Sequence, residues 1–175
     1  MEKGGSSYEE IVKLMKELMD LKKNVVKSTA HNGVLLSSHY PAMISEASHL
    51  HMLFFPFMAP GHMLPMVDMA KIFAARGICV TILTTPANAT IIHPSIDDSF
   101  HLHIIHFPSV MFSLPSECEN RSLIFGQDQL INFFKPLSSL CHSFDYVLRD
   151  SSPDCIVTDL FLPWTYYVAT TRGIP

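Results

Sequence analysis

Residues 51–85 read HMLFFPFMAPGHMLPMVDMAKIFAARGICVTILTT and contain the pattern that decides the fold. The opening run, 51–57, is rich in phenylalanine, leucine and methionine and ends among prolines, which predicts a buried strand. Apolar residues recur at helical spacing over 63–76, and Gly77 follows as a helix stop. The β-branched run 78–84 predicts a second strand. Strand, helix and strand in this order predict one parallel β-α-β unit.

The alternation of strands and helices continues toward the C-terminus. Thr85 and Pro86 are residue types favoured at a helix N-cap and first turn, so they predict a short helix. Residues 101–107 are a candidate third strand. One or two helices are predicted over 127–149, with an interruption at Pro136, because a proline lacks the backbone N–H and its ring disfavours a continuous helix.

A fourth strand and a last helix complete the pattern. Residues 155–159 predict the strand, which ends in Asp159, and Pro163-Trp164 opens a helix that stops at Gly173. Repeated strand-helix pairs build a parallel sheet with helices on both faces. The fold class is therefore predicted to be α/β and doubly wound, with strand order 3-2-1-4.

The first 48 residues have a different character. Ser7 and Glu10 stand at capping-box spacing before an apolar repeat, which predicts an amphipathic helix over about 8–23. No period persists over 24–48, which reads as a loose linker. We therefore expect an N-terminal extension over 1–48, not part of the domain, and a partial domain over 49–175.

Composition and charge narrow the classes of function. The chain has 175 residues, is 48% apolar and 16% charged, and has a net charge of −4 with histidine neutral. Such a chain can bury a core, and it lacks the basic patch of a nucleic-acid-binding protein. The four cysteines form no C-x-x-C pair, so we expect free thiols in a reducing cytosol. No secretory signal is recognisable, and prolines and histidines interrupt the most apolar stretch, so we expect a cytoplasmic protein without a membrane span.

The predicted topology brings two reactive residues to one edge of the sheet. His62 lies in the turn after the first strand, near the start of the next helix, and Asp159 closes the fourth strand. Ligands of doubly wound sheets bind beyond the carboxyl ends of the strands, where the strand order switches. Neighbouring strands are about 4.8 Å apart, so a hydrogen bond between the two side chains is feasible. A base oriented by an acid is one interpretation, and a structural histidine is the other.

Four blocks of the sequence read FFPFMAPGHMLP (54–65) with MAK (69–71), TILTTPANA (81–89), LPSECEN (114–120) and PDCIVTDLFLPW (153–164). These blocks resemble plant family-1 UDP-glycosyltransferases. They occur in the family's order and cover about residues 49 to 175. In detail the blocks are most similar to the branch of that family that glycosylates triterpenoids, flavonoids and other small hydroxylated metabolites.

The resemblance implies a fold and an activity. The fold would be the Rossmann-like N-terminal half of a GT-B enzyme, and the activity would be an inverting transfer of a sugar, such as glucose, from a UDP-sugar to a hydroxyl group. His62 would be the general base and Asp159 would stabilise the imidazolium. Met58, Gly61 and Trp164 are the candidate acceptor-binding residues; core packing is the alternative interpretation for Met58, and packing in the first turn of its helix is an equal alternative for Trp164. The UDP-sugar is a co-substrate, so no cofactor and no metal are expected.

The chain departs from the family pattern at both ends. The family's donor-binding signature, which contains Trp, His and Gln, does not occur in the sequence, so we expect a truncated and inactive enzyme. The opening EKGGSSY (2–8) and its predicted helix resemble the family's C-terminal tail instead. This leads to the hypothesis of a gene model that joins two tandem copies.

Other classes of protein function fit the sequence less well. The turn at 58–62 lacks the spaced glycines of a dinucleotide-binding fingerprint, which disfavours an NAD-dependent oxidoreductase. The sequence contains no P-loop and no G-x-S-x-G motif. His101, His103 and His106 do not share one face of a strand, and no acidic or thiol residue is adjacent, so ordinary sheet and surface positions are favoured over a metal site. A non-catalytic fragment that binds an apolar small molecule or a partner protein is the alternative function.

Overall fold

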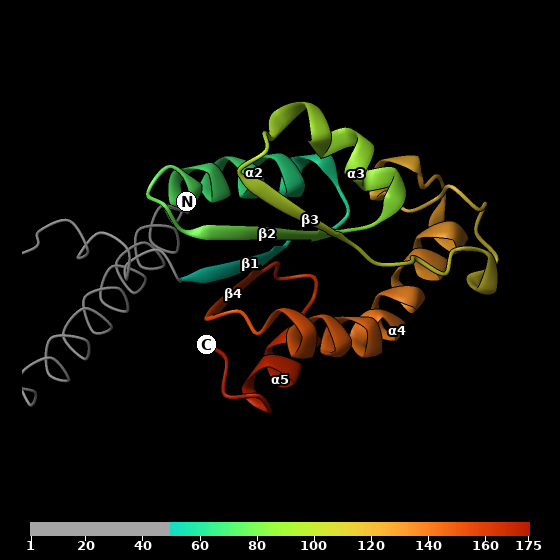
Figure 1. Ribbon diagram of the computed structural model, residues 1–175. Coiled ribbons are helices and arrows are strands. Elements are labelled where there is room, and N and C mark those ends of the chain that lie inside the picture. The colour runs from blue at the N-terminus through green and yellow to red at the C-terminus, as the bar shows by residue number, and fades with distance from the viewer. Residues whose placement is uncertain (1–49) are drawn as a thin grey trace, which may run out of the picture. The chain divides into compact units, whose positions relative to one another are not determined.

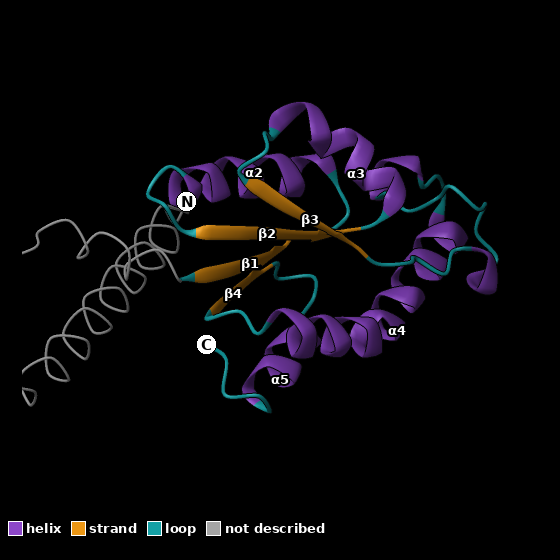
Figure 2. Cartoon of the chain, in the orientation of Figure 1, coloured by secondary structure: helices purple, strands orange, loops and turns teal. Residues whose placement is uncertain are grey.

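The computed structural model describes residues 50–175. The helix predicted over 8–23 and the linker predicted over 24–48 lie outside the described residues. The described part contains one parallel sheet in the order β3-β2-β1-β4 (Figures 1 and 2). The strands are β1 (His51–Phe55), β2 (Cys79–Thr84), β3 (Phe100–Ile104) and β4 (Cys155–Thr158). The predicted α/β class and the predicted strand order are confirmed.

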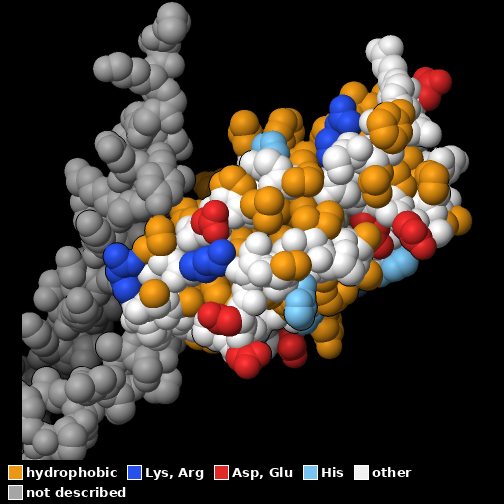
Figure 3. Space-filling model, turned by 90° about the horizontal axis from the view of Figure 1, so that it is seen from above, with side chains coloured by type: hydrophobic (Ala, Val, Ile, Leu, Met, Phe, Trp, Pro, Cys, Tyr) orange, Lys and Arg blue, Asp and Glu red, His pale blue; other side chains and the backbone are white. Residues whose placement is uncertain are grey.

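Helices cover both faces of this sheet. One face carries α2 (Pro60–Ala74) and α3 (Pro86–Ile92), and the other carries α4 (Gln127–Ser151) and α5 (Trp164–Thr170) (Figure 1). Within residues 50–175, three short 3-10 helices lie in the connections: η3 (His93–Ser95), η4 (Val110–Phe112) and η5 (Arg121–Leu123). On the face of α2 and α3, charged side chains are sparse and hydrophobic ones are frequent (Figure 3).

Residues 51–55 are strongly apolar because β1 is a central strand of the sheet. β1 pairs with β2 on one side and with β4 on the other, and Leu53 lies opposite Thr81 and Ile156. Phe54 contacts Phe73 of α2, whereas Leu53 and Phe55 belong to the core cluster on the side of α4. A strand buried on both faces needs apolar residues at consecutive positions, not only at alternate ones.

The predicted interruption at Pro136 is wrong. α4 runs through this proline as one helix of 25 residues. Pro136 is buried together with Phe133, Leu137 and Leu140 of the same helix. The proline removes one backbone hydrogen bond, but its own burial and that of its neighbours against the sheet offset the loss.

Candidate active site

His62 stands in the first turn of α2, at the carboxyl end of β1. The helix begins at Pro60, three residues before the predicted start, because a proline suits the first helical position. Ala59 is the N-cap, with φ −147° and ψ 137°, and its carbonyl accepts the N–H groups of His62 and Met63 at 2.9 Å. The third position of the helix is thus fixed directly above the end of the central strand.

Asp159 follows β4 immediately and lies in the turn that leads to α5. Its Oδ1 accepts the backbone N–H of Phe161 at 3.0 Å, and its carbonyl accepts the N–H of Leu162 at 2.9 Å. Aspartate favours such turns because its side chain can bond to the backbone two residues ahead. The orientation of the carboxylate is therefore set locally, before any contact with another element.

The two side chains meet as predicted. His62 Nδ1 lies 2.8 Å from Asp159 Oδ2, and the side chains are 39% and 10% exposed. An ionised carboxylate can only accept a hydrogen bond, so Nδ1 carries the proton and Nε2 of the neutral ring has a free lone pair. Within residues 50–175, no protein atom forms a hydrogen bond with Nε2. The exposed nitrogen of the ring is thus the basic one.

Two electrostatic influences act on the His62 ring, namely the N-terminus of α2 and the carboxylate of Asp159. The N-terminus of a helix disfavours a positive charge, and α2 has no acidic residue in its first turn. The carboxylate of Asp159, whose Oδ2 lies 2.8 Å from Nδ1, favours a positive charge on the ring. The helix N-terminus and Asp159 therefore act on a charge at His62 with opposite signs.

An aromatic wall surrounds the imidazole; we define it as Phe57, Phe134 and Phe161. The rings of Phe57 and Phe161 both lie 5.4 Å from the His62 ring, at interplanar angles of 76° and 67°. Phe134 stacks on Phe57 at 5.9 Å and 14°. Phe134 and Phe161 are 39% and 45% exposed, so their rings are open to a ligand. Sequence reasoning missed this wall, although Phe161 stands only two residues after Asp159.

The other predicted site residues lie in different surroundings. Met58 is buried in the core at 2% exposure. Gly61 is exposed beside His62, and no atom lies within 4 Å of the point that a Cβ would occupy. Trp164 is half-buried and packs against Phe55 and Phe144. Acceptor binding by Met58, Gly61 and Trp164 stays a prediction.

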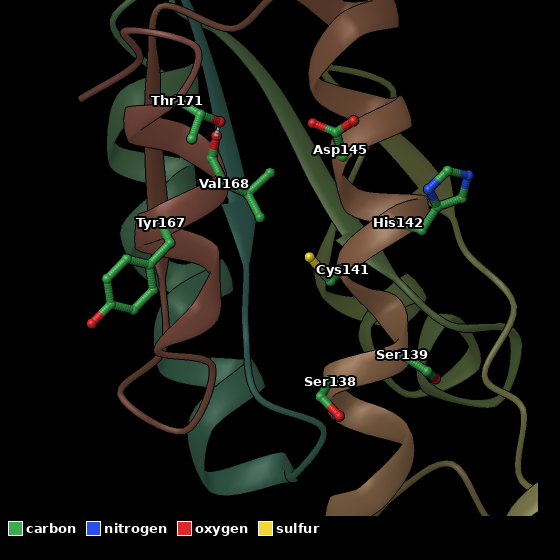
Figure 4. Close-up of a pocket in the computed structure, with 8 residues that line it drawn as sticks. All are labelled: Ser138, Ser139, Cys141, His142, Asp145, Tyr167, Val168 and Thr171. Carbon is green, nitrogen blue, oxygen red and sulfur yellow. Dashed lines mark hydrogen bonds between the residues drawn. The ribbon is translucent and has the colours of Figure 1, made fainter.

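A groove lies between α4 and α5 (Figure 4). This groove has a volume of about 520 Å³ and shares no lining residue with the His62–Asp159 pair. Its lining residues are Ser138, Ser139, Cys141, His142, Asp145, Tyr167, Val168 and Thr171. The thiol of Cys141 points into the groove, whereas the ring of His142 points away from it (Figure 4).

Among residues 50–175, no three His, Cys, Asp or Glu side chains are grouped so as to hold a metal ion. No helix in this part of the chain has the length and apolar character needed to cross a membrane.

Comparisons with known proteins identify the family. No family model matches the chain. Scopoletin glucosyltransferase from Nicotiana tabacum is 42% identical over 132 residues, which cover 72% of this chain and 28% of that protein. UDP-glucose flavonoid 3-O-glucosyltransferase 7 from Fragaria ananassa is 39% identical over 131 residues, covering 74% and 27%. The chain belongs to the plant UDP-glycosyltransferase family.

Solved structures of plant UDP-glycosyltransferases share its fold. UGT73P12 of Glycyrrhiza uralensis, complexed with glycyrrhetinic acid 3-O-monoglucuronide, matches with a TM-score of 0.66 and 39% identity, covering 72% of this chain and 27% of that one. UGT89C1 of Arabidopsis thaliana matches with a TM-score of 0.62 and 31% identity, covering 71% and 32%. The chain spans 28% of the length of the tobacco relative and 27% of the Glycyrrhiza uralensis chain.

Proposed function

We propose that residues 49–175 form the acceptor side of a UDP-sugar-dependent O-glycosyltransferase. The observation that carries this proposal is the 2.8 Å hydrogen bond from His62 Nδ1 to Asp159 Oδ2, with the His62 side chain 39% exposed and no hydrogen bond to Nε2 within residues 50–175. The bond fixes the tautomer in which Nε2 is a base. The similarity to named glucosyltransferases supplies the reaction class.

The chemical step follows from this geometry. Nε2 of His62 takes the proton of an acceptor hydroxyl, and the oxygen forms a bond to the anomeric carbon of the UDP-sugar. The bond between that carbon and the UDP oxygen breaks, so UDP leaves with the bonding electrons and the anomeric configuration is inverted. Asp159 stays ionised and stabilises the imidazolium, as the acid of a serine-hydrolase triad does. General base catalysis of this kind contributes about 10²- to 10⁴-fold in rate.

The aromatic wall supports a small hydroxylated acceptor with an apolar body. Phe134 and Phe161 expose ring surface next to the base. Aromatic rings bury a large area and orient flat partners by stacking or edge contacts. Flavonoids and triterpenoids are the acceptor classes that we propose, and Gly61 leaves space beside the base.

The proposal also includes the UDP-sugar donor and the cytosolic compartment. The UDP-sugar is bound mainly by parts of the enzyme that this chain does not match, since the chain covers 28% of the tobacco relative. Cys79, Cys118 and Cys141 are free thiols, which suits a reducing cytosol.

A chimera tests this function. Residues 50–175 replace the matching segment of the tobacco scopoletin glucosyltransferase, and transfer from UDP-glucose to a panel of flavonols and triterpenes is measured. We expect turnover, and an inverted anomeric configuration in the product as read by NMR. A folded chimera that binds a phenol or a triterpene but transfers no sugar would favour the non-catalytic alternative. The unmodified tobacco enzyme controls for the assay.

A further inference from the structure

A buried polar cluster joins the loop after β3 to the first turn of α3. Its members are Thr85, Asn88, Glu119 and Asn120, which are 0%, 0%, 6% and 1% exposed. Buried polar side chains are costly unless each has a hydrogen-bond partner, and each of these four has one. Glu119 is the one carboxylate among the buried residues of the described chain. The active-site chemistry described above does not use it.

Glu119 is fixed to α3 through its side chain and its backbone. Thr85 occupies the N-cap of α3, but its side chain makes no capping bond. Instead, Glu119 Oε2 accepts the N–H of Ala87 at 2.8 Å. Asn88 Nδ2 donates to Thr85 Oγ1 at 2.8 Å and to the carbonyl of Glu119 at 2.9 Å. A charged acceptor at a helix start makes a stronger bond than a neutral one.

Asn120 extends this restraint to the turn that carries the catalytic histidine. Asn120 Nδ2 donates to Asn88 Oδ1 at 2.5 Å, and its Oδ1 accepts the N–H and the hydroxyl of Ser122 at 2.9 and 2.7 Å. Arg121 stands between these two anchored residues. Its backbone N–H donates to the carbonyl of Met58 at 2.7 Å. The loop is therefore bonded to the connection between β1 and α2.

That connection determines where His62 lies. Ala59, the N-cap of α2, makes no side-chain capping bond, and its carbonyl accepts the N–H of His62. Phe57 precedes Met58 and packs against the imidazole at 5.4 Å. A displacement of the Met58 carbonyl would move its two neighbours, Ala59 and Phe57. The carbonyl of Ala59 accepts the N–H of His62, and the ring of Phe57 packs against the imidazole.

We propose that Glu119 and Asn120 are positioning residues that keep His62 aligned with Asp159. The catalytic meaning of this role rests on the proposed function, but the restraint is a property of the chain itself. Neither residue touches a substrate; they act through the bond between Arg121 and Met58. Replacing either residue is expected to make the first turn of α2 more mobile while the sheet stays folded.

The test reads the protonation of the His62 ring by ¹⁵N NMR in the 175-residue chain. The chain has 10 histidines, so the His62 signals are assigned by comparison with His62→Gln. In the unmodified chain we expect one tautomer, with the proton on Nδ1. In Glu119→Ala we expect this signature to be lost, with both ring nitrogens shifting toward the values of a mixture of tautomers.

Three further variants make the result decisive. Glu119→Gln keeps an oxygen acceptor for the N–H of Ala87, so it should restore the single tautomer. Asn120→Asp removes the donor to Asn88 but keeps both bonds to Ser122; it is the milder variant and should also lose the signature. Thr81→Val is the matched control, because Thr81 is buried and hydrogen-bonded to His51 near the opposite ends of the strands. At a loss of Tm equal to that of Glu119→Ala, Thr81→Val should leave the ¹⁵N signature of the His62 ring unchanged.

An unchanged His62 signature in folded Glu119→Ala and Asn120→Asp overturns the proposal, and so does an equal change in Thr81→Val. The NMR signature requires no turnover. A chimera without transferase activity would therefore contradict the proposed function while leaving the positioning role to be decided by these spectra.

Discussion

Phe161 donates its backbone N–H to Oδ1 of Asp159 at 3.0 Å, while the other carboxylate oxygen accepts from His62 at 2.8 Å. Both oxygens of Asp159 are therefore engaged, one by its own turn and one by the histidine. The turn orients the carboxylate, and the carboxylate in turn selects the tautomer of His62. The same short segment also supplies the ring of Phe161 to the aromatic wall.

The first prediction concerns Asp159→Asn. An asparagine can keep the bond to the N–H of Phe161, but its amide can donate to Nδ1 and stabilise the tautomer in which Nε2 carries the proton. The kcat of the chimera should fall by about 10²- to 10⁴-fold, with little change in the KM of the acceptor. Steady-state kinetics check this, and a melting curve confirms that the variant is folded. A loss confined to KM would contradict the assigned role.

Replacing Phe161 by leucine should act on binding more than on chemistry. Leucine keeps apolar volume but loses the ring that is 45% exposed beside His62. We expect the Kd of a flavonol, measured by fluorescence on the 175-residue chain, to rise by about 3- to 10-fold, in line with about 0.5–1.5 kcal/mol for an aromatic pair. Phe125→Leu is the matched control, because Phe125 is 76% exposed and makes no ring contact with His62. Equal effects of both variants would argue against the aromatic wall.

Stability should depend on pH through Asp145. Hydrogen bonds from the Arg172 guanidinium, together with Arg149, hold the pKa of Asp145 below its ordinary value of 3.8. A carboxyl whose pKa is lower in the folded state stabilises the protein above the unfolded pKa and loses this effect as the pH falls through the folded pKa. The Tm difference between the unmodified chain and Asp145→Asn should therefore be largest at neutral pH and should close below pH 3.8.

Melting curves between pH 7 and pH 3 measure that difference. Asp68→Asn is the control, because the carboxylate of Asp68 is 71% exposed and pairs with Lys71 on the surface. Exposed pairs of this kind contribute about 0–1 kcal/mol. A Tm difference for Asp145→Asn that stays constant over the whole range would show that the charge of Asp145 is not what stabilises the fold.

The end of α4 offers a backbone prediction. Ser152 is the C-cap of α4 and has φ +42° and ψ 58°, a left-handed conformation that suits glycine. Ser152→Gly should raise the free energy of unfolding by about 0.5–1 kcal/mol. The adjacent Ser151→Gly should lower it by about 0.5 kcal/mol, because Ser151 is the last residue of the helix and glycine has a lower helix propensity than serine. Urea denaturation of the two variants should thus give effects of opposite sign.

The indole of Trp164 gives a further test of packing. Its Nε1 is buried and has no hydrogen-bond partner in the described part of the chain. An unpaired buried donor costs about 1–3 kcal/mol. Trp164→Phe removes this donor as well as apolar volume, so the two effects should nearly cancel and the free energy of unfolding should change by less than about 1 kcal/mol. A loss typical of a large core truncation would mean that the N–H is satisfied in solution.

The elements that decide the fold were readable because their signals are local. The apolar run at 51–57, the helical spacing after it and the β-branched run at 78–84 each predict one element, and the observed strands and helix fall there with shifted ends. The fold rules for parallel sheets then place His62 and Asp159 at one edge. The interruption predicted at Pro136 was wrong because the loss of a helix hydrogen bond at the proline is offset by burial, and burial depends on the tertiary structure.

The surroundings of His62 could not be predicted in the same way. Phe134 lies on α4, far along the chain from Phe57, and the two rings meet only once α4 packs on the sheet. The bond from Arg121 to Met58 joins two loops that have no periodic pattern. Contacts between segments distant in sequence leave no spacing signal, so they require coordinates.

In the proposed mechanism, His62 is the base that starts the transfer. The most direct measurement is the single-turnover rate of sugar transfer in the chimera with His62→Ala, under saturating donor and acceptor. We expect the rate to fall by about 10²-fold or more, while acceptor binding is retained. Transfer at the unmodified rate in the folded variant would contradict the assignment of His62 and, with it, the role given to Asp159.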